Sequence, residues 1–173
     1  MDRRLPNSES MHDFSAAVGE IIIWANMIDY QLGYAIVRIL VLPSHAMTEP
    51  LVSQLDARPK IEILKKRLKF LPKNSDWRIG ISTWLKDVEG VMRNRNTAAH
   101  CRIQICEDRI ELKSSQLTKI FDSLLPNLAS KENHGLDEIH QWIEKAKICF
   151  SKGQTVIENL DNFAEEVRRR RVK

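Results

Sequence analysis

The chain has 173 residues, of which 43% are hydrophobic and 29% charged, and it contains only six glycines and six prolines. These values are ordinary for a single globular domain, and they disfavour a loop-rich β-sandwich or a disordered chain and favour long helices. The net charge is +4, but five positive charges lie in the tail at 168–173. Residues 1–167 therefore sum to −1, which excludes a globally basic nucleic-acid binder and leaves local clusters or the tail to bind phosphate.

The three cysteines are scattered, and no Cys or His cluster has the spacing of zinc ligands. We therefore expect free thiols in a reducing, cytoplasmic compartment, with no metal and no cofactor. The first apolar stretch, 18–42, contains five polar or charged residues. Such a stretch is a poor membrane span, so no membrane partner is expected.

Three helices are expected in the first hundred residues. Apolar residues recur every three or four positions over 14–42, which predicts one long helix. A second helical region is expected over 51–71, with a restart at Pro59 and Asp56 as the N-cap. Its many lysines are typical of a solvated face. A third helix is expected over 77–99.

The residues that follow change their period. Alternating isoleucines and polar residues over 101–112 predict a two-stranded hairpin. A short helix is expected over 116–125, a loop over 126–135 and a last long helix over 136–168. Gly153 either weakens that helix or lets a neighbour approach closely. The fold class predicted is all-α: one domain over 1–173, built as a four-to-five-helix bundle with a small β-hairpin after the third helix.

Arg95 is the first candidate functional residue, because it falls on the apolar seam of the third helix. A charge on a buried stripe must find a partner or bind an anion. Asn96 and His100 are four residues apart and share one helix face, with Arg93 on the same side. No acid occurs between residues 89 and 107. This set can hold a phosphodiester, orient a hydroxyl and move a proton near neutral pH.

The segment Arg95-Asn96-Thr97-Ala98-Ala99-His100 resembles the R-polar-x-x-x-H motif of HEPN domains (higher eukaryotes and prokaryotes nucleotide-binding), and the segments 18–24 and 29–32 are similar to their first helix. The resemblance implies a homodimer in which two motif helices face each other across a composite cleft. It also implies a metal-independent endoribonuclease that acts as a toxin, in phage defence or in RNA processing. The implied partners are RNA and an antitoxin protein.

The resemblance also implies roles for individual residues. His100 would be the general base or acid at the ribose 2′-hydroxyl, Arg95 would hold the scissile phosphate, and Asn96 would orient it. The product would end in a 2′,3′-cyclic phosphate. Arg93 is a second arginine at a spacing from His100 that the family tolerates, and Glu20 or Asp29 of the first helix would pair with Arg95. The candidates for RNA contact are Arg102, Arg168, Arg169, Arg170 and Arg171.

Other interpretations remain open on the same residues. Arg95 is also compatible with a structural arginine, and His100 with a cation favoured at a helix C-terminus. The domain would then be a catalytically silent dimerisation or binding module for a protein or a nucleotide, or an unrelated bundle. The arginine tail is either a solvated end, an RNA-tethering arm or an antitoxin contact. Because five residues turn an ideal helix by about 140°, one chain alone does not bring Arg95 and His100 together.

Overall fold

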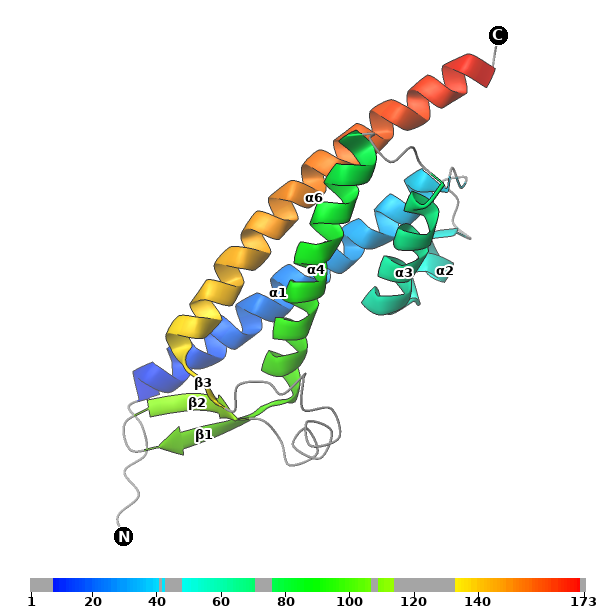
Figure 1. Ribbon diagram of the computed structural model, residues 1–173. Helices are drawn as coiled ribbons and strands as arrows, with labels where there is room; N and C mark the ends of the chain where they lie inside the picture. The colour runs from blue at the N-terminus through cyan, green and yellow to red at the C-terminus, as the bar shows by residue number, and fades with distance from the viewer. Residues whose placement is uncertain are drawn as a thin grey trace.

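The computed structural model describes residues 8–40, 42, 48–70, 76–106, 109–113 and 133–171. Within these residues, five helices surround one core and a small sheet closes one end (Figure 1). The elements are α1 (Ser8–Ile39), α2 (Thr48–Ser53), α3 (Ala57–Leu68), α4 (Asp76–His100), β1 (Arg102–Cys106), β2 (Arg109–Lys113), β3 (Asn133–His134) and α6 (Leu136–Arg171). The predicted fold class, a helical bundle with a small hairpin after the third long helical region, is confirmed.

Two long helices form the frame of the bundle. α1 and α6 lie side by side and run in the same direction, and α4 packs against both in the opposite direction (Figure 1). The expected apolar periodicity of α1 is confirmed, since Phe14, Ile21, Ile28 and Leu32 are all buried. Burying such an apolar face is the main stabilising term of a helical bundle.

The three long helices meet closely at Gly153. The side chain of Gln31 in α1 donates from Nε2 to the carbonyl oxygen of Phe150, 3.0 Å away. The Trp84 indole in α4 donates from Nε1 to the carbonyl oxygen of Cys149, at 3.2 Å. A Cβ atom added at Gly153 would lie 2.2 Å from Gln31 Oε1 and 2.9 Å from Trp84 Nε1. The glycine therefore allows the close approach, which is one of the two alternatives that its position left open.

α3 carries an ion pair that the sequence interpretation missed. The expected restart is confirmed, since Asp56 stands at the N-cap and Pro59 in the first turn. The expected solvated basic face is wrong for Lys60, whose side chain is only 2% exposed. Lys60 Nζ lies 2.6 Å from Asp29 Oδ2 in α1. A buried ammonium group needs such a partner, and this pair ties α3 to α1.

The sheet joins the end of α4 to the start of α6. β1 and β2 pair antiparallel, with Ile103 opposite Leu112, as the hairpin prediction requires. β3 adds a third strand by pairing His134 with Leu112. The expected loop over 126–135 is therefore wrong at Asn133 and His134, because a two-residue strand leaves no periodic signal. The expected short helix over 116–125 and the rest of that loop lie outside the described residues.

The close approach at Gly153 predicts opposite effects for two glycine substitutions. Gly153→Ala should lower the free energy of unfolding by about 1–3 kcal/mol, because the new methyl group displaces two buried hydrogen-bond donors. Gly80→Ala in α4 has open space around it and should raise that free energy by about 0.5–1 kcal/mol through helix propensity. Urea denaturation measures both. Equal effects of the two substitutions would contradict the packing described here.

Candidate functional site

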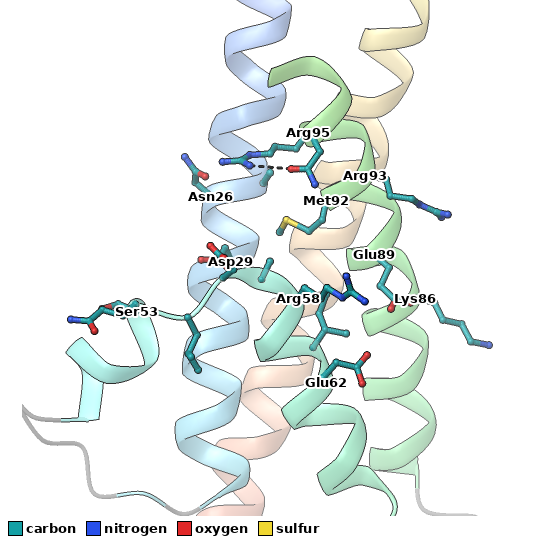
Figure 2. A pocket seen from close by; sticks show the side chains of 17 residues that line it. Asn26, Asp29, Ser53, Arg58, Glu62, Lys86, Glu89, Met92, Arg93 and Arg95 are labelled. Carbon is teal, nitrogen blue, oxygen red and sulfur yellow. Dashed lines mark hydrogen bonds between the residues drawn. The ribbon is translucent and has the colours of Figure 1, made fainter. Parts of the chain in front are cut away.

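A cleft of about 1000 Å³ lies between α1, α4 and the α2–α3 region. Arg95 and Asn96 line it from α4, and Asn26 and Asp29 line it from α1. Figure 2 shows the Arg95 side chain extending from α4 toward α1, where Asn26 projects. The structure thus brings two of the three predicted motif residues, together with Arg93 and Asp29, to one cavity.

The charges around this cleft are unequal in their pairing. Three of its four acidic residues, Asp29, Glu62 and Glu89, are paired with Lys60 or Lys65 of α3, and the fourth, Asp56, is the exposed N-cap residue of α3. Its four cations are Arg58, Lys86, Arg93 and Arg95. None of them forms a salt bridge with a carboxylate of the described residues. Six cations, counting Lys60 and Lys65, thus stand against four acids, and this excess gives the cleft a positive potential, which favours an anionic ligand.

Arg95 and Asn96 form a polar unit at the surface. Arg95 Nη1 donates to Asn96 Oδ1, 3.0 Å away. Arg95 is only half-buried, although it falls on the buried seam of α4 that continues to Ala98. Its stem therefore leaves the core and its guanidinium reaches the cleft. A guanidinium held by a neutral amide keeps its other N–H groups for a planar anion such as a phosphate.

His100 lies apart from Arg95 within one chain. It is the exposed last residue of α4 and does not line the cleft. Residues 86, 89, 93, 96 and 100 follow at steps of three or four, so they form one outward stripe of α4. The first four of these residues, Lys86, Glu89, Arg93 and Asn96, also line the cleft, whereas His100 does not. Because α4 stays helical through His100, the side chains of Arg95 and His100 leave the helix in different directions, as expected.

The two candidate acids of α1 pair with other residues. Asp29 binds Lys60, as described above. Glu20 Oε1 accepts a hydrogen bond from Trp24 Nε1 at 3.1 Å and lies 3.3 Å from Lys147 Nζ in α6. The expected ion pair of Arg95 with Glu20 or Asp29 is therefore wrong. The sequence shows that these two acids lie on the first helix, but it does not show which of the many cations in the chain will contact them.

The remaining arginine candidates are spread over the molecule. Arg102 is exposed at the start of β1, two residues after His100. The four tail arginines belong to the last turn of α6, which extends to Arg171. Their side chains and Lys173 lie outside the described residues. Of these five arginines, only Arg102 is close to the motif in the sequence.

A second groove of about 770 Å³ lies on the other side of α4, between α4 and α6. Its wall includes His134, which is 7% exposed and lies 3.0 Å from Glu138 by its Nδ1 atom. The His134 ring also packs edge-on against Trp142. Sequence reasoning missed this buried histidine because it assigned it to a loop. In the described part of the chain, no group of His, Cys, Asp and Glu is arranged to hold a metal ion.

The described thiols are not suited to nucleophilic chemistry. Cys149 is buried in α6, and its burial raises its pKa to about 12. Burial also raises the pKa of the half-buried Cys101 thiol. A nucleophilic cysteine needs a lowered pKa and access to solvent. These two residues therefore stay protonated at neutral pH.

Comparison with known proteins adds no relative. Neither a family model, nor a curated protein, nor a solved structure matches the chain. In addition, none of the helices within the described ranges is both long and apolar enough to cross a membrane.

The Glu20 contact predicts a pH dependence of stability. The hydrogen bond from Trp24 and the nearby Lys147 lower the pKa of the Glu20 carboxyl below its ordinary value of 4.5. A lowered folded-state pKa stabilises the fold above pH 4.5, and this contribution is lost as pH falls through the lower value. Glu20→Gln should thus be less stable than the wild type at pH 7, and the difference should close on acidification.

Urea midpoints measured from pH 7 to pH 3 test this prediction. Glu144→Gln is the matched control, because it also removes a carboxylate beside Lys147 but leaves the Trp24 bond intact. A gap between wild type and Glu20→Gln that widens toward low pH would contradict the assignment.

Proposed function

We propose that this protein is a metal-independent endoribonuclease of the HEPN type. The observation that carries the proposal is the Arg95–Asn96 pair on a cleft where cations outnumber acids and where four cations have no salt-bridge partner among the described residues. The exposed His100 follows on the same helix end, and Arg102 follows it in β1. Phosphate binding, orientation and proton transfer are the three tasks that RNA cleavage requires, and these residue types perform them.

The proposed reaction uses the substrate's own hydroxyl as the nucleophile. His100 takes the proton of the ribose 2′-hydroxyl, and the 2′-oxygen attacks the adjacent phosphorus. The bond from phosphorus to the 5′-oxygen breaks, and that oxygen takes a proton from solvent water. Arg95 balances the negative charge that grows on the phosphoryl oxygens, and Asn96 holds the Arg95 guanidinium in place. The products are a 2′,3′-cyclic phosphate and a 5′-hydroxyl.

A homodimer is part of the proposal because one chain does not join the two roles. His100 lies outside the cleft that Arg95 lines. If two copies meet beside the cleft, the His100 of one protomer acts at the phosphate held by the Arg95 of the other. The biological setting that we propose, a cytoplasmic toxin or defence effector held by an antitoxin, comes from the resemblance of the motif and agrees with the free thiols.

A second function is favoured by the same separation of Arg95 and His100. A chain that holds anions in the cleft and never brings His100 to them would be a silent module that binds a nucleotide or a partner protein. The positive cleft supports this alternative equally well. It differs from the nuclease only in the role of His100.

Cleavage of a labelled oligoribonucleotide in the presence of EDTA tests the proposal. Wild type should release 2′,3′-cyclic phosphate ends, and Arg95→Ala or His100→Ala should reduce the rate by at least about 100-fold. Arg67→Ala and His12→Ala are the matched controls, because both residues are exposed and lie away from the cleft. A folded wild type that binds the RNA without cutting it would favour the silent module. Cleavage that survives both motif substitutions would contradict the assignment of the site.

A further inference from the structure

The outward face of α1 carries an apolar stripe that no described element covers. Ile23, Met27 and Tyr30 are 60%, 39% and 68% exposed. Their spacing of four and three residues puts them on one face of the helix, opposite the buried face that contains Ile21 and Ile28. The stripe spans about 10 Å of helix from Ile23 to Tyr30, since each residue adds about 1.5 Å.

The charge around this stripe indicates a protein partner. α1 contains no lysine or arginine before Arg38. Its acids nearest the stripe, Glu20 and Asp29, are engaged by Lys147 and Lys60. An RNA-binding face needs cations, and an interfacial membrane helix places lysines and arginines beside its apolar face. Neither description fits, whereas an uncharged centre with aromatic and methionine side chains is typical of protein interfaces.

The large and small side chains of the stripe match when two copies of α1 lie antiparallel. Ala16 and Gly19 lie on the same outward face, two turns and one turn before Ile23 respectively, and a Cβ atom at Gly19 would have nothing within 4 Å. Tyr30 lies two turns after Ile23. Two antiparallel copies of α1, related by a twofold axis near residue 25, place each Tyr30 opposite a Gly19. The same register places each Ile23 opposite a Met27. A twofold interface uses one patch on both subunits, so large and small residues must alternate within it.

We propose that a second copy of this chain docks here, α1 against α1 and antiparallel, with each Tyr30 ring seated over the partner's Gly19. Asn26 lies between Ile23 and Tyr30 in this stripe and also lines the cleft beside Arg95. The twofold axis near residue 25 therefore brings two clefts to the interface. The choice of a second copy rests on the proposed function, which needs a composite site, and the surface itself is argued from α1 alone.

Sedimentation velocity of the full chain tests the interface. Wild type should be a dimer with a dissociation constant of about 10 µM or tighter, and Ile23→Glu should weaken it by at least about 30-fold. Ile79→Glu is the matched control, since Ile79 is 56% exposed on α4 and should leave the dimer unchanged. Circular dichroism melting confirms that each variant is folded. A monomeric wild type at 100 µM, or a dimer that Ile23→Glu leaves intact, would overturn the proposal.

A size exchange tests the register. Gly19→Leu has open space in the protomer but occupies the place of the partner's Tyr30 ring, so dimerisation should weaken by at least about tenfold. Adding Tyr30→Ala puts a small residue opposite the new leucine, and the double variant should return to within about tenfold of wild type. A double variant weaker than both single variants would exclude this register.

The outcome is separable from that of the nuclease. If Ile23→Glu breaks the dimer but the wild type does not cleave RNA, the proposed interface is supported and the proposed nuclease function is contradicted. If the wild type cleaves RNA but Ile23→Glu does not weaken the dimer, the nuclease function is supported and this interface is contradicted.

Discussion

The contact of three helices at Gly153 is the constraint on which the rest of the molecule depends. At that point the side chains of Gln31 and Trp84 both donate hydrogen bonds to backbone carbonyls of α6. Gln31 is 4% exposed and Trp84 is 1% exposed, so neither polar group has access to water as a substitute. An unpaired buried donor is destabilising, which makes the close approach obligatory once these residues are in the core.

This junction also determines where the functional end of α4 lies. Because Trp84 fixes α4 against α6 and Lys60 fixes α3 against α1, a cleft remains between α1, α3 and residues 86–96 of α4. The ion pairs Lys60–Asp29 and Lys65–Glu89 also offset two of the four acids on the cleft wall. The excess of positive charge around Arg95 therefore depends on ion pairs that α3 makes with α1 and with α4.

The fold could be predicted from the sequence where its signal is local. Apolar periodicity located α1, α4 and α6, and the change of period after His100 located the hairpin. Lys60 and the short strand at Asn133–His134 could not be predicted, because both depend on partners far away in the chain. Lys60 lies 31 residues from Asp29, and His134 pairs with Leu112. A pattern of residue types along one helix carries no information about such partners.

The candidate site divides in the same way. The position of Arg95 on an apolar seam correctly indicated an unusual arginine, and helix geometry correctly separated it from His100. The partners of Glu20 and Asp29 were assigned wrongly, since several cations compete for each acid. The chain alone therefore presents a cleft with an excess of cations and a histidine outside it, and under our proposal a second copy completes the catalytic site.

The most direct test of the composite site mixes two inactive variants. Arg95→Ala and His100→Ala are each purified, mixed in equal amounts and allowed to exchange subunits before RNA cleavage is measured. Half of the dimers would then be mixed, and each would hold one of its two sites intact, so the mixture should recover about a quarter of the wild-type rate. A mixture that stays inactive, although exchange is verified and wild type cleaves, would contradict a site shared between two chains.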